Sequence, residues 1–426
     1  MTDAMTDAMT DLAHGRRERL DRLGRDFLDH FTQAAGFALL EPEPAIPHHD
    51  RTILFTNSAV VPFKPFLLGE SALPAPGVAV RQPCVRVHNL DEVFEEGFET
   101  EFVLQFEMLG VLAPAARARA LVAAVAGYLT TTLGLDGPSV AFKAAHDDTD
   151  LCAAWEAGWT GPVLLDTEER DYYRWGFGHP RLGGRGATVA VRQADGHLRD
   201  LGNLIAFERD GEVAGYGFGI GLETLAACLD GSPWVLDCTP AGAVVGARSS
   251  DEAKLADLLG LLVRLYAAGV RTSSRAQGHV LRRAVSATAR LAAGLGLDQA
   301  RLLHRLAVVA AADAPGRDVL GPAGPDLERY RPREDSRHVH DLSFWCADGT
   351  DPEALSATAA QVALPGVHRI SASVKDVWHG ERTSVTLAVA LDLPPSADKP
   401  EAKQALRALA ARLGERCGTE LRGEIR

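Results

Sequence analysis

The sequence predicts an α+β fold built from three structured parts, and three observations support this prediction. Residues 16–245 alternate strand-like segments with turns and a few helices, whereas residues 246–315 show a helical pattern throughout. Residues 338–426 follow the order strand, helix, strand, strand, helix, strand. A chain of 426 residues, 46% of them hydrophobic, is long enough for two or three domains with cores of their own.

The first part begins with a predicted helix. Residues 16–36 carry apolar side chains at helical spacing, and Gly36 then acts as a stop signal; the apolar residues are Leu20, Leu23, Phe27, Leu28 and Phe31. The preceding residues 1–15 contain the repeat MTDAMTDAMTD, rich in Thr and Asp, and we expect a disordered tail there. This stretch lacks the basic start and apolar core of a secretory signal.

The strands of the first part are predicted from apolar runs bounded by turn residues. They are ILF at 53–55, CVRV at 84–87, EFVLQFEML at 101–109 and a strand-rich stretch at about 187–221. A helix is predicted over about 114–134.

The last part follows a segment rich in Gly, Pro and charge, residues 316–337, which we interpret as a linker. Its predicted elements are a strand at 341–346, a helix at 352–362, strands at 367–377 and 383–392, a helix at 399–415 and a short final strand. The order βαββαβ is that of the ferredoxin-like unit.

Composition narrows the class of protein. The net charge of −13 disfavours indiscriminate binding of polyanions. Residues 252–318 nevertheless hold ten Lys and Arg against five Asp and Glu, which suits either a nucleic-acid contact or a solvated helix face. Six scattered cysteines form no CxxC pair, and no run of 18 apolar residues occurs, so we expect a cytoplasmic protein without zinc site, disulfide framework or membrane span.

Five segments in the first two parts resemble alanyl-tRNA synthetases, in the order of that family. They are AIPHHDRTILFTNSAVVPFKPFLLG (45–69), RQPCVRVHN (81–89), FEMLG (106–110), GFGIGLETLAACL (217–229) and GVRTSSRAQGHVLRRAVSATARLA (269–292). The resemblance implies a class II synthetase antiparallel sheet core with flanking helices over residues 16–245. It also implies an all-α tRNA-acceptor-like module over residues 246–315, in which the family's GxVLRR is retained at 278–283.

Residues 338–426 resemble the ferredoxin-fold anticodon-binding domain at the end of phenylalanyl-tRNA synthetases. The match rests on DLSF at 341–344, VKDVWHG at 374–380, SVTLAVAL at 384–391 and ELRG at 420–423.

The resemblance assigns roles to residues of a nucleoside site. Arg86 falls where the family places the cation that stabilises the α-phosphate, and a bidentate Arg suits that charge better than Lys. Phe106 falls where the family stacks the adenine base. Further nucleoside-binding candidates are Glu107, Met108, Gly219, Gly221, Glu223 and Thr224, of which Glu223 retains a family acid that can contact a metal or a phosphate-bound water.

Two departures from the family pattern bear on the reaction. Thr224 replaces the arginine that packs on adenine and holds the γ-phosphate of ATP, and Gly217 replaces the aspartate that binds the substrate ammonium. A buried ammonium needs a partner, and Glu208, in place of a family glutamine, is our candidate for the missing carboxylate. Further candidates for binding the amino acid are Tyr173, Asn203 and Ile205.

The acceptor-like module keeps arginines suited to phosphate contact, while the loop that reads the alanine tRNA has changed. The candidate tRNA-binding residues are Arg271, Arg275, Arg282 and Arg283.

Three functions remain open at this point. The first is a specialised paralogue that transfers alanine, or another small amino acid, to an adenosine-like small molecule, with alanyl-tRNA or ATP-activated alanine as donor. The second is a reduced alanyl-tRNA synthetase that charges tRNA with alanine. The third is a catalytically inactive tRNA-binding or regulatory protein.

Cofactors and partners follow from these alternatives. Activation of the amino acid would require ATP with Mg²⁺, whereas alanyl-tRNA as donor would require no cofactor. The expected partners are tRNA, foremost alanine tRNA, a small amino acid and an adenosine-like small molecule, and the class II resemblance implies a homodimer. We expect no metal-binding residues and no membrane contact.

Overall fold

The computed structural model describes residues 3–47, 53–87, 90, 103–159, 161–166, 170–331, 336–347, 349–394, 397 and 399–425. Its contacts divide the chain into two compact units. The first comprises Met1–Val285 and Ala300–Asp326, and the second comprises Ser286–Gln299 and Leu327–Arg426. No helix of the described residues is long and apolar enough to cross a membrane.

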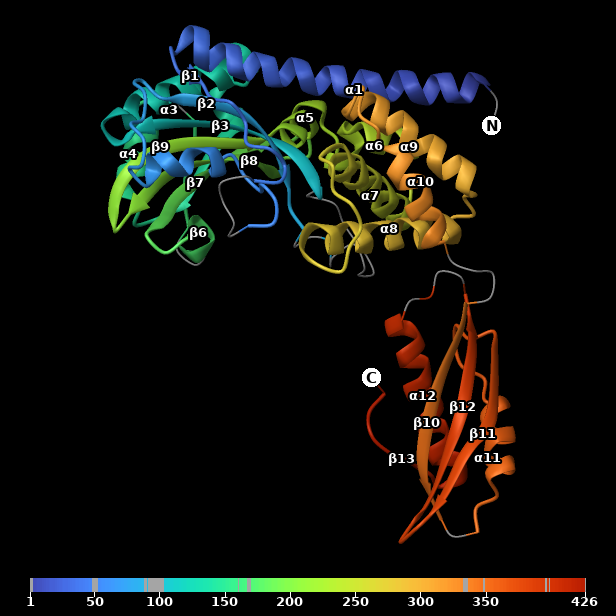
Figure 1. Ribbon diagram of the computed structural model, residues 1–426. Coiled ribbons are helices and arrows are strands. Elements are labelled where there is room, and N and C mark those ends of the chain that lie inside the picture. The colour runs from blue at the N-terminus through green and yellow to red at the C-terminus, as the bar shows by residue number, and fades with distance from the viewer. Residues whose placement is uncertain are drawn as a thin grey trace. The chain divides into compact units, whose positions relative to one another are not determined.

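The first unit is built on a large mixed sheet (Figure 1). Its strands are β1 (Ala38–Leu39), β2 (Val78–Val85), β3 (Gln105–Pro114), β4 (Val140–Ala145), β5 (Val163–Asp166), β6 (Arg174–His179), β7 (Leu182–Arg192), β8 (Leu198–Arg209) and β9 (Glu212–Gly221). The order is β1-β2-β3-β9-β8-β7-β4-β5, with β6 paired to β7. All pairs are antiparallel except β1 with β2 and β4 with β5, at the two edges. The predicted α+β class with an antiparallel sheet core is therefore confirmed.

Helix α1 (Asp3–Asp29) continues into a short π-helical turn (His30–Ala34). It buries Leu20, Leu23, Phe27 and Phe31, as the helical spacing predicts. The prediction of a disordered tail over residues 1–15 is wrong, because the helix already includes Asp3 and fully buries Ala13. Ala and Met within the repeat are strong helix formers, and they outweigh the weaker Thr and Asp once the helix is anchored by its following turns.

The other predicted elements of the first unit differ at their ends. ILF at 53–55 is not a strand but a turn whose Phe55 is buried. The first two residues of CVRV end β2, and residues 105–109 of EFVLQFEML begin β3. Residues 101–102 of that predicted strand lie outside the described residues, as do residues 88–89 and 91–100. The helix predicted at 114–134 is α3 (Ala118–Gly127), extended by a π-helical turn (Tyr128–Thr132). The strand-rich stretch at 187–221 is confirmed as the antiparallel strands β7, β8 and β9.

Helices α7 (Ser250–Ala267), α8 (Ala276–Gly294) and α9 (Gln299–Asp313) confirm the predicted helical pattern. A capping box starts α7: the Ser249 hydroxyl accepts a hydrogen bond from the backbone N–H of Glu252, and the Glu252 carboxylate accepts one from the backbone N–H of Ser249. The linker prediction for 316–337 is wrong in part, because α10 (Leu320–Arg329) lies within it. Asp318 caps this helix by accepting a hydrogen bond from the N–H of Gly321 (2.8 Å), and Ala323 and Leu327 are fully buried.

The second unit carries the predicted βαββαβ order. Its elements are β10 (Ser336–Cys346), α11 (Pro352–Ala360), β11 (Arg369–His379), β12 (Thr383–Leu393), α12 (Lys399–Cys417) and β13 (Glu420–Leu421). The antiparallel strand order β11-β12-β10-β13 confirms the ferredoxin-like fold. Alternate residues of β10, such as Leu342 and Phe344, are buried in one core with Leu406 and Leu409 of α12.

Candidate active site

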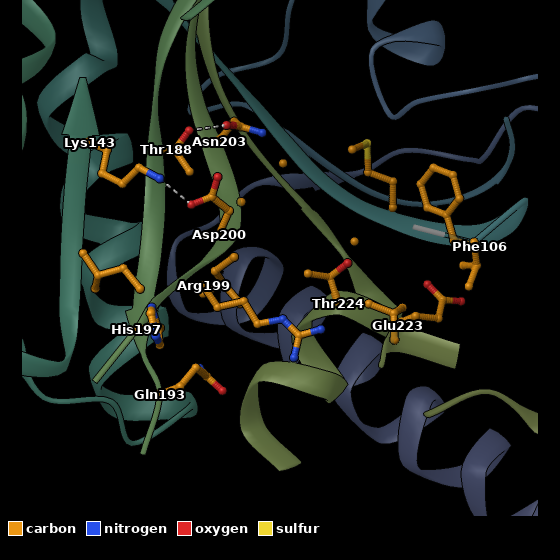
Figure 2. Close-up of a pocket in the computed structure, with 18 of the residues that line it drawn as sticks. Phe106, Lys143, Thr188, Gln193, His197, Arg199, Asp200, Asn203, Glu223 and Thr224 are labelled. Carbon is orange, nitrogen blue, oxygen red and sulfur yellow. Dashed lines mark hydrogen bonds and ion pairs between the residues drawn. The ribbon is translucent and has the colours of Figure 1, made fainter. Parts of the chain in front are cut away.

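A pocket with a volume of about 1030 Å³ is formed over the central strands of the first unit (Figure 2). The strand register places Lys143 of β4, Thr188 of β7, Asn203 of β8 and Gly219 of β9 in one row across the sheet. All four line the pocket. A Cβ atom at Gly219 would meet only one atom within 4 Å, the carbonyl oxygen of Leu109 at 4.0 Å, so the missing side chain leaves open space. The volume is that of a small-molecule site.

The pocket brings together eight of the residues that the sequence singled out. They are Arg86, Phe106, Met108, Asn203, Gly219, Gly221, Glu223 and Thr224. They come from β3, β8, β9, the chain after β2 and the start of helix α5 (Leu222–Asp230). These segments are far apart in the sequence, so their convergence depends on the sheet order.

Arg86 and Phe106 contact each other at the β3 side of the pocket. The Arg86 guanidinium carbon lies 4.7 Å from the centre of the Phe106 ring, in a cation–π contact. Its Nε donates a hydrogen bond to the carbonyl of Asn57 (3.1 Å). Burial lowers the pKa of Arg86, and none of the carboxylates that the structure describes pairs with it. A partly buried cation without a carboxylate partner is suited to bind an anionic ligand group.

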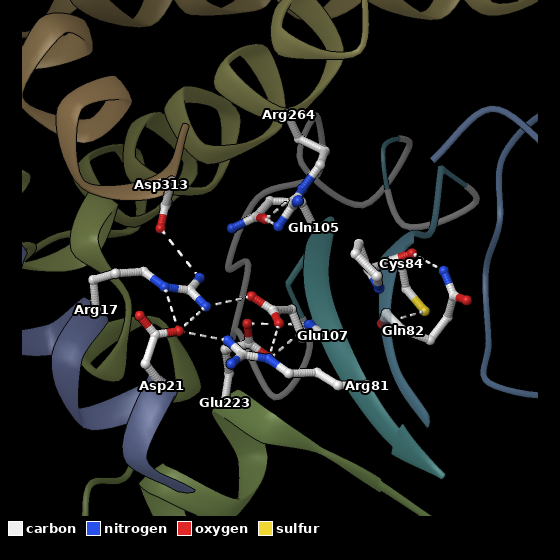
Figure 3. Close-up of polar contacts among 11 residues, drawn as sticks. Arg17, Asp21, Arg81, Gln82, Cys84, Gln105, Glu107, Glu223, Arg264 and Asp313 are labelled. Atoms are coloured by element: carbon white, nitrogen blue, oxygen red, sulfur yellow. Dashed lines mark hydrogen bonds and ion pairs between the residues drawn. The ribbon is translucent and has the colours of Figure 1, made fainter. Parts of the chain in front are cut away.

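Glu107 does not belong to the pocket, and its prediction as a nucleoside-binding residue is wrong. Its carboxylate is 6% exposed and lies between the guanidiniums of Arg17 and Arg81 (Figure 3). Although burial acts to raise the pKa of Glu107, these two arginines hold it below its usual range. Asp21 and Asp313 complete the network, at 2.7 Å from Arg81 and 3.6 Å from Arg17. The network joins α1, β2, β3 and α9.

Glu223 lies beneath the pocket and is held by Glu107. Both carboxylate oxygens accept hydrogen bonds from the backbone N–H of Glu107 (3.1 and 3.0 Å). Burial and the nearby negative charge of Glu107 raise the pKa of Glu223 from 4.5 to about 8. Within the described ranges no three His, Cys, Asp or Glu side chains are arranged to hold a metal ion. The predicted contact of Glu223 with a metal or a phosphate-bound water stays a prediction, and we assign no step to Mg²⁺.

The raised pKa of Glu223 predicts a pH dependence of stability. Because folded Glu223 keeps its proton up to about pH 8 and unfolded Glu223 loses it near pH 4.5, the folded state loses stability across this interval as the pH rises. We expect Glu223→Gln, which is neutral at every pH, to lack this component. Urea unfolding at about pH 5, 7 and 9 should therefore show the variant gaining stability relative to the wild type as the pH rises. Asp257 and Asp313 titrate alike in both proteins, so parallel curves would contradict the assignment.

Gly217 and Ile205 lie beyond the end of the pocket, where aromatic rings fill the space, and neither lines it. A Cβ atom at Gly217 would lie 2.7 Å from the Phe207 ring and 2.7 Å from the carbonyl oxygen of Val111. Phe207 packs on Phe177, with 5.2 Å between the ring centres. Position 217 therefore has no room for an acidic side chain, and the predicted contact of Gly217 and Ile205 with the amino acid finds no support in this arrangement.

Glu208 and Tyr173 are also misplaced in the sequence-based prediction. Glu208 alternates with Phe207 along β8 and lies on the opposite face, where its carboxylate accepts from Nε of Arg185 (2.9 Å). Tyr173 is 1% exposed and belongs to the core, while the neighbouring Tyr172 lines the pocket. For Glu208 the alternation of side chains along the strand decides the outcome, because a shift of one residue changes the face. Tyr172 and Tyr173 lie in a 3-10 helical turn (Arg170–Tyr173), which directs the two rings differently.

The pocket contains an acidic residue that the sequence reasoning missed. Asp200 accepts from Nζ of Lys143 (2.7 Å) and from the hydroxyl of Tyr172 (2.8 Å). A β-bulge places it there, since Val189 pairs with Gly202 and Ala190 with Asp200, leaving Leu201 without a partner strand residue. Bulges next to ligand sites commonly redirect one side chain in this way. The only signal in the sequence is a charged residue inside a predicted strand.

The hairpin between β7 and β8 was missed as well. Gln193, His197 and Arg199 line the pocket opposite Phe106 (Figure 2). Arg199 donates to the carbonyl of Ser232, and its second Nη lies 3.5 Å from the carbonyl of Pro233.

The predicted tRNA-binding arginines lie at and before the start of α8. Arg271 and Arg275 are exposed, and Arg282 contacts Nδ1 of His279 (2.9 Å). The loop before α8 packs closely against the helix at Gly278. A Cβ atom at that position would lie only 2.3 Å from Oγ of Ser273. Arg283 is half-buried on the same helix, and none of the four arginines lines the pocket. Their role in binding tRNA stays a prediction.

Comparisons with known proteins found several similar sequences and structures. The family model described as tRNA synthetases class II (A) matches residues 22–179. The alanine–tRNA ligase of Acidithiobacillus ferridurans is 26% identical over 382 residues, covering 80% of this chain and 43% of the ligase. That of Caulobacter sp. (strain K31) is 27% identical over 354 residues, covering 73% and 38%. The apo histidyl-tRNA synthetase of S. aureus matches with a TM-score of 0.31 and 14% identity over 52% of this chain and 72% of that one.

Residues 22–179 are therefore similar to class II (A) tRNA synthetases. The homologues of the chain over most of its length are alanine–tRNA ligases, and the chain spans about two fifths of the length of these relatives.

Proposed function

We propose that this protein binds an adenosine beside an aminoacyl group and transfers that group to an adenosine-like small molecule. The observation that carries the proposal is the arrangement of the pocket over one sheet face. Arg86 and Phe106 lie at one end, Gly219 leaves open space in the middle, and Asp200 lies at the other end. The alanine–tRNA ligase relatives support the choice of alanine or another small amino acid.

Asp200 is our candidate for the carboxylate that binds the substrate ammonium, in place of Glu208. Each of its oxygens accepts one hydrogen bond, from Lys143 or from Tyr172, and a carboxylate oxygen can accept a second. The carboxylate is therefore held in position and still has capacity for a ligand donor. Replacement of the family aspartate by Gly217 is compatible with this relocation, because the Phe207 ring fills the former place.

The proposed reaction is acyl transfer. A nucleophilic amine or hydroxyl of the acceptor attacks the carbonyl carbon of the donor, forming a C–N or C–O bond. The C–O bond to the tRNA ribose or to AMP breaks, and the nucleophile loses its proton to the medium. Arg86 lies where a cation can stabilise the negative charge that develops on oxygen, and such stabilisation is a large term in acyl transfer.

A second candidate function is a reduced alanyl-tRNA synthetase. The exposed Arg271 and Arg275 near the start of α8 favour it, because exposed arginines suit contact with phosphates. In this case tRNA would be the acceptor, and the product would be alanyl-tRNA rather than a small molecule.

Binding of alanyl-sulfamoyl adenosine tests the proposed pocket. We expect this adenylate analogue to stabilise the full chain by about 2.7 kcal/mol at a hundredfold excess over its Kd, seen as a higher Tm. Asp200→Asn should weaken binding of the analogue about ten- to hundredfold, because it removes a charged hydrogen-bond partner, and should leave adenosine binding unchanged.

Asp210→Asn is the matched control, since Asp210 is exposed and its ion pair with Arg181 lies outside the pocket. This variant should bind like the wild type. Absence of any stabilisation of the wild type by the analogue would instead support an inactive tRNA-binding protein.

A further inference from the structure

We infer that Arg199 forms an anion subsite for the phosphate chain of an adenine nucleotide, on the β7–β8 hairpin side of the pocket. The inference rests on the proposed function, because it assumes that a nucleoside occupies the Phe106 end. It adds a binding residue outside the segments that resemble the family's nucleotide motifs, and it names ATP-activated amino acid as the donor.

The pairing of the pocket's cations singles out Arg199. Four cationic side chains line the pocket, and two of them are committed to carboxylates: Lys143 pairs with Asp200 and Arg174 with Asp148, each at 2.7 Å. Arg86 and Arg199 pair with no carboxylate in the part of the chain that the structure describes. Two cations without carboxylate partners, in one pocket, favour a ligand with more than one anionic group.

Backbone carbonyls hold the Arg199 guanidinium in place. It donates to the carbonyls of Ser232 and Pro233, directly after helix α5. A guanidinium has five N–H donors, and a cation near the carbonyl end of a helix is favourable. Arg199 is thus positioned by neutral acceptors while further donors remain for a ligand.

Arg199 and Thr224 line the same pocket (Figure 2). The resemblance to class II synthetases places an arginine for the γ-phosphate at position 224, and the threonine there carries no charge. Arg199 reaches the pocket from β8 instead, so the cation approaches from the hairpin wall rather than from α5. The loss at position 224 therefore does not leave the pocket without a second cation.

Neighbouring groups support an anion at this place. Gln193 and His197 of the same hairpin also line the pocket and can donate hydrogen bonds. Two carboxylates lie near Arg199 in the sequence and line the pocket: Asp200 is bonded to Lys143 and Tyr172, and Asp195 accepts a hydrogen bond from the backbone N–H of His197 (3.0 Å).

Calorimetric binding of ATP, AMP and adenosine to the full chain tests the inference. We expect the wild type to bind ATP more tightly than AMP or adenosine. Arg199→Ala should weaken ATP binding about ten- to hundredfold and leave adenosine binding unchanged, because only the phosphate contact is lost. Arg199→Lys keeps the charge and should lose less than the alanine variant.

Arg192→Ala is the matched control. Arg192 lies on the same hairpin, is exposed, donates to the carbonyl of Gly196 and does not line the pocket. Equal ATP affinity of Arg199→Ala and Arg192→Ala would overturn the inference, as would a wild type that binds ATP no more tightly than adenosine. Failure of the wild type to bind adenosine or alanyl-sulfamoyl adenosine would overturn the proposed function instead, so the two failures are distinguishable.

Discussion

Replacing Arg86 with alanine is expected to slow aminoacyl transfer about 100- to 1000-fold, the usual cost of removing one preorganised donor from a developing oxyanion. The guanidinium lies over Phe106 and is oriented by the carbonyl of Asn57, so its position is set before a ligand binds. The Arg86 guanidinium carbon lies 4.7 Å from the centre of the Phe106 ring. The proposed sites for the base and for the developing charge are therefore adjacent.

Steady-state kinetics with saturating amino acid would measure this loss. Arg86→Lys should retain part of the rate, because lysine keeps the charge and loses the planar fork. Arg192→Ala should behave like the wild type. A rate for Arg86→Ala within a few-fold of the wild type would remove Arg86 from the proposed chemistry.

Replacing Arg17 with methionine is expected to destabilise the first unit by about 3–5 kcal/mol, the usual cost of breaking a buried ion pair. Arg17 contacts the carboxylates of Asp21 and Glu107 at 2.6 and 2.7 Å. The Glu107 and Asp313 side chains are only 7% and 6% exposed, so water cannot replace the lost guanidinium.

Denaturant unfolding of the full chain would measure this change in the transition of the first unit. Arg181→Ala is the matched control, because Arg181 and Asp210 are 54% and 52% exposed and such surface pairs contribute little to stability. Equal effects of the two substitutions would show that the buried network does not anchor α1 to the sheet.

The sequence predicted the fold class well, and it named residues that the structure brings together in one pocket, for a physical reason. Helical spacing and strand runs reflect burial directly, as Phe27 and Phe31 of α1 illustrate. Arg86, Phe106 and Gly219 lie within segments whose order along the chain resembles that of a known family. They meet in one pocket because β2, β3 and β9, on or next to which they lie, are neighbours in the sheet.

The residues expected to bind the amino acid were placed poorly, because their positions depend on register and packing. Glu208 is one residue from the pocket face of β8, and Asp200 reaches that face through a bulge. Neither fact is visible in composition or spacing. In the sequence, Gly217 stands where the family has an aspartate. In the structure, the Phe207 ring fills the space beside this glycine. Local patterns likewise missed the helical start of α1 and the short helix α10.

Transfer of labelled alanine to a small molecule tests the central claim most directly. The full chain would be incubated with adenosine and amino-substituted analogues, and either with alanine and ATP or with pre-charged alanyl-tRNA. We predict an alanylated nucleoside in the reaction with ATP, detected by mass spectrometry. Alanine found only on added tRNA would contradict small-molecule transfer and support a reduced synthetase, and a product formed only from alanyl-tRNA would contradict the use of ATP.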